Sequence, residues 1–208
     1  MEANKAIFLD KDGTLIPDIP YNVNPDLITL NKGVLEGLEI LNKFGYLFII
    51  ISNQAGIAKG YFKEEDLIGV EQKIKQLLDQ KSIRLSGFYY CPHLETGSVP
   101  QYAIQCNCRK PNPELILRAS KEHHIDLNRS WMIGDILDDV EAGKTAGCRS
   151  ILVDNGHENE WCVNGNLNRV PNWIATDFLE ASLYISHQYN PYKLKENEQG
   201  TFEYSQEI

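Results

Sequence analysis

The chain has 208 residues, of which 42% are hydrophobic and 24% are charged, a composition typical of folded globular proteins. These values exclude collagen-like, coiled-coil and wholly disordered chains. There are 20 Lys and Arg against 29 Asp and Glu, so the net charge of −9 disfavours nonspecific attraction to nucleic acid or anionic membranes. The length fits one domain with a tail rather than two full domains.

The longest strongly apolar stretch, residues 46–51, is far shorter than the roughly 20 residues that a membrane-spanning helix needs. The first ten residues lack the basic start, apolar stretch and cleavage site of a secretory signal. We therefore expect a cytoplasmic protein with no membrane or nucleic-acid partner. The five cysteines are odd in number and unevenly spaced, which favours reduced thiols or a metal site over a disulfide framework.

Short apolar runs predict buried strands, and segments with apolar residues at helical spacing separate them. In chain order we predict a strand at 6–9, a helix at 33–44, a strand at 46–51, a helix at 64–81, a strand at 85–90, a helix at 113–123, a strand at 131–133, a helix at 138–146 and a strand at 150–153. Asn112 is the expected N-cap of the third helix, and Gly147 is expected to end the fourth. The alternation predicts an α/β fold with a mostly parallel sheet and helices on both faces. We expect this domain to span 1–188, followed by a tail, 189–208, that is mobile or straps the body, because the tail lacks an apolar period.

Polar residues gather where predicted strands end, the edge at which open parallel sheets bind ligands. The pairs are Asp10/Asp12, Ser52/Asn53 and Asp135/Asp139, together with Arg109/Lys110 before the third helix. One shared site would use all of them. Each pair alone has a plain alternative: a solvated acidic turn, a polar turn, a helix-start acid or solvated surface cations.

Two carboxylates two residues apart can divide the work of phosphate ester hydrolysis. One of the two, Asp10 or Asp12, could attack phosphorus as a nucleophile while the other protonates the leaving oxygen. Attack on an anionic phosphate needs a cation, and Asp10, Asp12 and Asp135 could hold Mg²⁺. Asp139 could orient Asp135 or Lys110, while Lys110 adds a positive charge for the phosphoryl group.

The segment 91–108 carries soft metal ligands in two close pairs. Cys91 and His93 precede Cys106 and Cys108, a set that suits a closed, structural zinc site; free cysteines in a surface loop are the alternative. Cys148 has no such pattern, and we expect it to be a buried small hydrophobe. Structural or surface roles are expected for the remaining histidines, which are His123, His124, His157 and His187.

Four ordered motifs carry a family resemblance: FLDKDGTL at 8–15, SNQAGIAKGYF at 52–62, CPH to CNCRKP at 91–111 and IGDILDD at 133–139. Together they resemble the haloacid dehalogenase-like phosphatases, and within them the zinc-containing branch of heptose bisphosphate and histidinol phosphatases. The resemblance runs from about residue 5 to 155. It implies a Rossmann-like core in which the zinc loop replaces a large cap domain.

The resemblance also implies roles for individual residues. Asp10 would be the nucleophile, Asp12 the general acid and then base, and Mg²⁺ would bind Asp10, the backbone carbonyl of Asp12, and Asp135. The implied substrate-binding residues are Ser52, Asn53, Lys59, Arg109 and Lys110, with Asp139 in support. Three positions depart from the pattern: Ile136 replaces a common Lys or Arg, Ala55 replaces Ser, and Lys59 replaces Arg.

The expected function is a Mg²⁺-dependent phosphatase with an aspartyl-phosphate intermediate, acting as a monomer on a small phosphorylated metabolite. The long loop between His93 and Cys106 favours removal of the 7-phosphate of D-glycero-D-manno-heptose 1,7-bisphosphate in surface-polysaccharide precursor synthesis. The alternatives are histidinol phosphate or another small sugar phosphate. A noncatalytic zinc-stabilised binding protein is a further alternative of a different class. The segment 16–28 matches neither branch closely, and we expect it to shape the substrate pocket.

Overall fold

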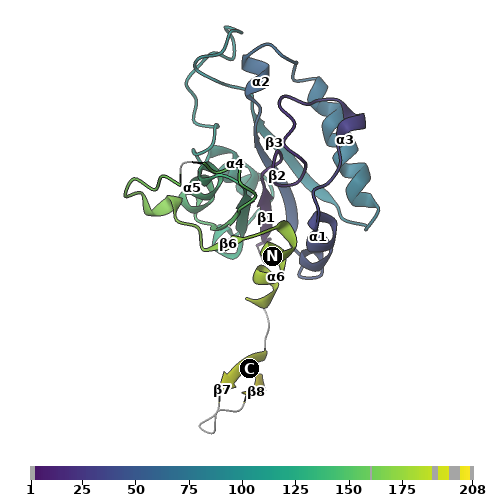
Figure 1. Ribbon diagram of the computed structural model, residues 1–208, viewed down its shortest axis with the longest axis vertical. Coiled ribbons are helices and arrows are strands. Elements are labelled where there is room, and N and C mark those ends of the chain that lie inside the picture. The colour runs from purple at the N-terminus through teal and green to yellow at the C-terminus, as the bar shows by residue number, and fades with distance from the viewer. Residues whose placement is uncertain (1–2, 160, 189–191, 197–201, 207–208) are drawn as a thin grey trace.

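A six-stranded parallel sheet forms the centre of the molecule, with the strand order β3-β2-β1-β4-β5-β6 (Figure 1). The computed structural model describes residues 3–159, 161–188, 192–196 and 202–206. The strands of the sheet are β1 (Ala6–Leu9), β2 (Leu47–Asn53), β3 (Leu85–Cys91), β4 (Trp131–Gly134), β5 (Arg149–Val153) and β6 (Trp173–Ala175). The helices are α1 (Val34–Asn42), α2 (Ala55–Ala58), α3 (Asp66–Asp79), α4 (Glu114–Glu122), α5 (Leu137–Ala146) and α6 (Phe178–His187), with short 3-10 turns at Pro25–Leu27, Leu127–Arg129 and Leu167–Arg169.

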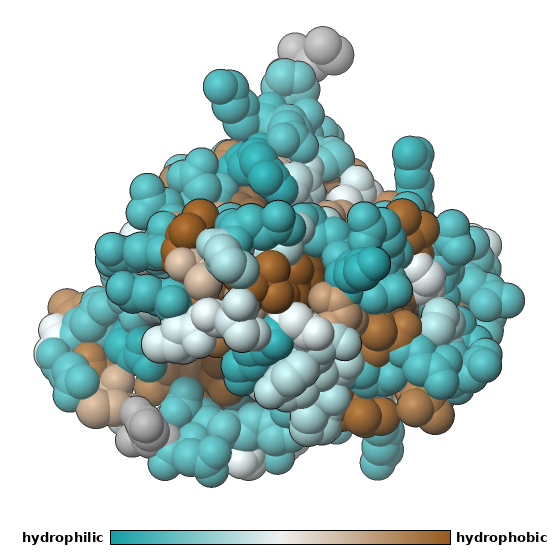
Figure 2. Space-filling view, turned by 90° about the horizontal axis from the view of Figure 1, so that it is seen from above, coloured by the Kyte–Doolittle hydropathy of each residue, from teal (hydrophilic) through white to brown (hydrophobic). Residues whose placement is uncertain are grey.

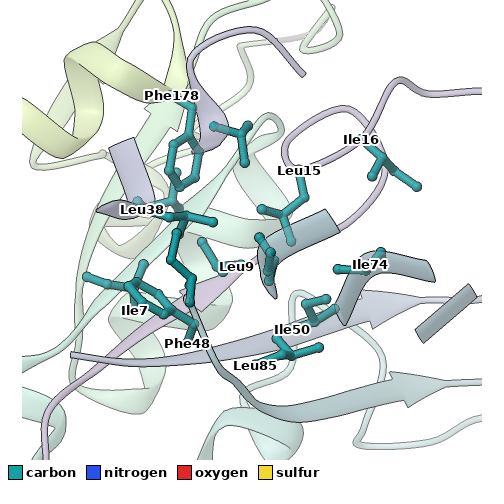
Figure 3. Close-up of a cluster of buried hydrophobic side chains, with 14 of the residues drawn as sticks. Ile7, Leu9, Leu15, Ile16, Leu38, Phe48, Ile50, Ile74, Leu85 and Phe178 are labelled. Atoms are coloured by element: carbon teal, nitrogen blue, oxygen red, sulfur yellow. The ribbon is translucent and has the colours of Figure 1, made fainter. Parts of the chain in front are cut away.

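Side chains of the central strands alternate between two hydrophobic layers, because successive residues of a strand point to opposite faces. In β1, Ile7 and Leu9 belong to the layer under α1, α3 and α6 (Figure 3). Ala6 and Phe8 belong to the layer under α4 and α5. Figure 1 shows α1 and α3 on one side of the sheet and α4 and α5 on the other. The predicted α/β fold with helices on both faces is confirmed.

The predicted strands and helices are all present, with ends shifted by a few residues. Gly147 ends α5 as expected, in the left-handed conformation (φ 103°) that glycine adopts without steric cost. The expected N-cap of α4 is wrong: Pro113 occupies that position without a side-chain hydrogen bond. The Asn112 amide instead points to the zinc loop, where it donates to the backbone carbonyl of Cys106 at 3.4 Å.

The longest loops at the carboxyl edge of the sheet follow β1, β3 and β5 and span residues 10–33, 92–113 and 154–172. In their described parts, which omit residue 160, none forms a separate cap domain. Figure 2 views the molecule from above, where α2 lies; hydrophilic atoms surround a small group of hydrophobic ones near the centre of that face. No helix among the described residues is long and apolar enough to span a membrane.

The C-terminal tail contains two strands, β7 (Tyr192–Glu196) and β8 (Phe202–Gln206), which pair antiparallel in a sheet of their own. Neither strand is among the elements predicted from the sequence. Residues 189–191, 197–201 and 207–208 lie outside the described part of the chain. The boundary at 188 and the mobile or strapping role of the tail stay predictions.

Candidate active site

The carboxyl ends of β1, β2 and β4 bring the predicted polar residues to one cavity of about 230 Å³. Its lining contains Asp10, Asp12, Asp18, Ser52, Asn53, Lys110, Asp135, Ile136, Asp139 and His157. Three of the predicted pairs therefore meet as expected. The fourth is divided, because Lys110 lines this cavity whereas Arg109 lines a neighbouring one beside the zinc loop.

Lys110 is the buried cation of the site. Its ammonium lies 2.5 Å from a carboxylate oxygen of Asp10 and 2.5 Å from one of Asp139, and it also donates to the backbone carbonyl of Ile51 at 2.9 Å. Burial by itself would lower the pKa of Lys110, but the two carboxylates reverse this and raise it. Lys110 therefore stays charged at neutral pH. Of the two partners expected for Asp139, Asp135 and Lys110, its carboxylate contacts Lys110.

Three buried carboxylates, those of Asp10, Asp135 and Asp139, each place an oxygen within 4.8 Å of the other two. Burial raises the pKa of Asp10 to about 7 and that of Asp135 to about 6, because a charged carboxylate loses its hydration there. The single positive charge of Lys110 balances only part of the negative charge that the three ionised carboxylates would carry. A hard divalent cation bound by oxygen ligands fits this donor set and would keep the carboxylates ionised.

Asp12 lies at the mouth of the cavity, with 31% of its side chain exposed. Its carboxylate pairs with the buried Lys11 and accepts a hydrogen bond from Gln54 Nε2 at 3.0 Å. Gln54 also donates to Ser52 Oγ at 2.7 Å, so one amide links the two predicted site residues. Sequence reasoning assigned no role to Gln54, although it follows directly after the Ser52/Asn53 pair.

Asn53 holds the backbone of Lys110 rather than pointing freely into the cavity. Its amide nitrogen donates to the carbonyl of Lys110 at 3.1 Å, and its amide oxygen accepts from the Lys110 N–H at 3.0 Å. This reciprocal pair joins the end of β2 to the segment that carries the buried Lys110. The contact gives Asn53 a positioning role in addition to any contact with substrate.

The loop after β5 supplies residues that the motifs did not indicate. His157 Nδ1 lies 2.6 Å from Asp135 Oδ2, and Asn155 donates to the carbonyl of Gly13 at 2.7 Å. Thr14 Oγ1 donates to the other oxygen of Asp135 at 3.1 Å. His157 thus has a partner that the sequence did not indicate, because its ring lies against a carboxylate of the site. The histidine is 22 residues from Asp135 in the chain, so no local motif marks the pair.

Cys91, His93, Cys106 and Cys108 converge, as their spacing predicts. The three sulfurs lie 3.1–3.5 Å apart, and His93 Nδ1 lies 3.2 Å from Cys108 Sγ and 3.7 Å from Cys91 Sγ. These distances approach the edge of about 3.8 Å that a tetrahedron with zinc–sulfur bonds of about 2.3 Å has. All four positions are filled by side chains, so the set fits a closed metal site. Cys148 is buried, as expected.

Lys59 and Arg109 lie outside the lining of the catalytic cavity. Lys59 Nζ donates to the hydroxyl of Tyr21 at 2.5 Å, and this hydrogen bond raises the pKa of Lys59. The charge of Arg109 is near enough to oppose that shift. Arg109 itself donates to the backbone carbonyl of His93 at 3.5 Å, which ties its position to the zinc loop.

Comparisons with known proteins agree with this geometry. A family model for HAD-hydrolase-like proteins matches residues 107–181. The chain is 42% identical over 153 residues to the D-glycero-beta-D-manno-heptose-1,7-bisphosphate 7-phosphatase of Pasteurella multocida, covering 73% of this chain and 83% of the relative. It is 33% identical over 187 residues to the phosphatase of the same name from Escherichia coli K12, covering 89% and 96%.

Two solved structures share the fold. The first is a putative HAD-like phosphatase from Mesorhizobium loti, with 30% identity, a TM-score of 0.76 and coverage of 89% of this chain and 87% of that one. The second is the heptose bisphosphate phosphatase of B. bronchiseptica with magnesium and phosphate, with 24% identity, a TM-score of 0.71 and coverage of 88% and 99%. The chain belongs to the haloacid dehalogenase-like phosphatases, in the branch that contains the heptose bisphosphate phosphatases.

Proposed function

We propose that this protein is a Mg²⁺-dependent phosphatase that removes the 7-phosphate of D-glycero-D-manno-heptose 1,7-bisphosphate through a phosphorylated Asp10. The observation that carries the proposal is the contact of Lys110 with Asp10 inside a cavity that also holds Asp12 and Asp135. The names of the relatives from Pasteurella multocida and Escherichia coli support the choice of substrate.

In this mechanism the carboxylate of Asp10 attacks the phosphorus atom, and the ester oxygen leaves. Lys110 lies beside Asp10 and would balance the charge of the phosphoryl group, assisted by the hydroxyl of Ser52. Asp12 would donate a proton to the leaving oxygen and then take one from the water that hydrolyses the aspartyl phosphate. The partial exposure of Asp12 suits both steps, because the leaving group and the water reach the site at its mouth.

Asp10, Asp135 and the backbone carbonyl of Asp12 would hold Mg²⁺, which supplies charge neutralisation for attack by one anion on another. Asp139 would keep Lys110 in place rather than bind the metal, because its carboxylate already contacts the ammonium. His157 would orient Asp135 from the second coordination sphere.

The segment that contains Arg109 and Lys110 would be held by a structural zinc ion bound to Cys91, His93, Cys106 and Cys108. The carbonyl of His93 accepts from Arg109, so the zinc loop would position that guanidinium for a second anionic group of the substrate. Lys59 offers a further cation on the same side.

The experiment is a comparison of kcat/KM for phosphate release from heptose 1,7-bisphosphate and from histidinol phosphate in the presence of Mg²⁺. A strong preference for the bisphosphate is the expected result. A preference for histidinol phosphate would contradict the proposed substrate. It would agree with Ile136, which lines the catalytic cavity at a position where the resemblance leads us to expect Lys or Arg. Release from neither would leave another small phosphorylated metabolite as the substrate.

A further inference from the structure

A second cavity, of about 340 Å³, opens beside the catalytic one. The two cavities share three lining residues, namely Asp12, Asp18 and Asn53. Asp12 is the group that would protonate the leaving oxygen, so the part of the substrate beyond that oxygen must lie on the Asp12 side of the phosphoryl group. This second cavity is therefore placed to receive the leaving group.

The charges in the second cavity disfavour an anion. Its lining includes the carboxylates of Asp12 and Asp18, and its one cation, Lys11, is buried and already paired with Asp12. A phosphate inside it would meet two like charges without a free cation. A neutral group with hydroxyls suits it better, because Asp18 can accept hydrogen bonds from hydroxyl groups.

A partly exposed aromatic ring lines this cavity. Tyr21 belongs to the lining, and 44% of its surface is exposed. The ring is held from two directions: Lys59 donates to its hydroxyl at 2.5 Å, and Tyr61 packs edge-on against it with ring centroids 4.6 Å apart. Tyr21 also adopts a positive φ of 56°, a conformation that few residues other than glycine take and that persists where surrounding contacts enforce it.

We propose that the second cavity binds the leaving group as a polyhydroxylated carbon chain, and that Tyr21 is the residue that determines specificity for it. The ring packs against the C–H face of the chain while Asp18 accepts its hydroxyls. Lys59 is a positioning residue that fixes the ring and leaves any second phosphate at the rim, outside the acidic lining. This inference rests on the proposed phosphatase function and adds the cavity that receives the leaving group and the residue that selects it.

The test measures kcat/KM for two phosphates in the full-length protein with Mg²⁺. One is heptose 1,7-bisphosphate, and the other is acetyl phosphate, whose leaving group has no polyol. The variants are Tyr21→Ala, Tyr21→Phe and Lys59→Met, with Ile68→Ala as the control. Ile68 lies on α3, is 56% exposed and is outside the lining of both cavities.

We expect Y21A to lower the ratio of kcat/KM for the sugar phosphate to that for acetyl phosphate about fivefold, mainly through KM. Y21F keeps the ring and loses the hydroxyl that Lys59 holds, so Y21F and K59M should lower the ratio by a similar, smaller factor. I68A should leave the ratio as in the wild type. A Y21A ratio equal to that of the wild type overturns the proposal, whether both activities fall together or neither changes.

The same measurement separates this inference from the proposed substrate. If the wild-type protein hydrolyses another sugar phosphate and not the heptose bisphosphate, the proposed substrate is wrong. The effect of Y21A on the ratio for that sugar phosphate then still decides the role of Tyr21. Turnover of acetyl phosphate with no turnover of any sugar phosphate would overturn the polyol site as well.

Discussion

The ammonium of Lys110 lies 2.5 Å from Oδ1 of Asp10, a residue 100 positions earlier in the chain. The same ammonium also contacts Asp139, so one cation balances two buried carboxylates. This arrangement places a positive charge beside the atom that would attack phosphorus. It also makes the site depend on Lys110 for stability as well as for catalysis.

Replacing Lys110 with Met should lower kcat by about 10²–10³-fold, because the charge opposite the phosphoryl group is lost. It should also destabilise the protein by about 3–5 kcal/mol, since two buried carboxylates lose their partner. The double variant K110M/D139N removes one of those carboxylates, so it should recover part of the stability and none of the activity. Thermal unfolding and steady-state kinetics of both variants check this. A K110M enzyme with near-normal kcat would contradict the role of Lys110.

Replacing His157 with Asn should weaken Mg²⁺ binding about tenfold. The shorter amide side chain replaces the imidazole ring that contacts and orients Asp135. At saturating Mg²⁺ the rate should return close to that of the wild type. The measurement is the Mg²⁺ concentration at half-maximal activity, with His187→Asn, at the end of α6, as the control. Equal half-saturation in wild type and H157N would show that the contact with Asp135 has no bearing on the metal.

Purified protein should contain about one zinc per chain. Cys106→Ser removes one ligand and should lose the metal and lower the unfolding temperature, whereas Cys162→Ser should do neither. Metal analysis and thermal unfolding of the two variants check this. Folded, active wild-type protein without zinc would refute the proposed zinc site.

Glu64 ties the zinc loop to the body of the protein by accepting hydrogen bonds from Tyr102 at 2.5 Å and Tyr90 at 2.6 Å. These bonds lower the pKa of Glu64 below its ordinary value of 4.5, so its ionised form stabilises the folded state. The contribution is present above pH 4.5 and is lost as the pH falls further. Because the side chain is partly exposed, we expect Glu64→Gln to lower Tm at pH 7 by about 2–4 °C.

The difference in Tm between wild type and E64Q should shrink below pH 4.5, where Glu64 becomes protonated. Unfolding curves at a series of pH values between 3 and 7 measure this. Glu65→Gln, at the neighbouring position, is the control. A difference that grows as the pH falls would have the opposite sign and would contradict the argument.

The strands β1 and β4 were predictable because they are short, apolar and buried on both faces. The meeting of Asp10, Ser52 and Asp135 followed from the same pattern, since parallel strands end at one edge. The sixth strand escaped prediction because β6 has three residues at the edge of the sheet, two of them exposed. Helix α6 was not predicted either, although the sequence carries a signal for it: Asp177 caps the helix, and apolar residues follow at helical spacing.

The contacts that the pattern missed are those between distant segments. Arg109 and Lys110 are neighbours in the chain, yet only Lys110 lines the catalytic cavity, where the Asn53 amide holds its backbone. His157 reaches Asp135 only because the loop after β5 returns over the site. No periodicity or local motif encodes such pairings, since they depend on where a loop crosses the edge of the sheet.

The most direct test of the account is phosphate release from heptose 1,7-bisphosphate by wild-type protein and by Asp10→Asn, measured with Mg²⁺ at equal protein concentration. The account predicts turnover by the wild type and no detectable turnover by D10N, with zinc content and unfolding behaviour showing that the variant is folded. Near-normal turnover by folded D10N would contradict an attack by Asp10 on phosphorus.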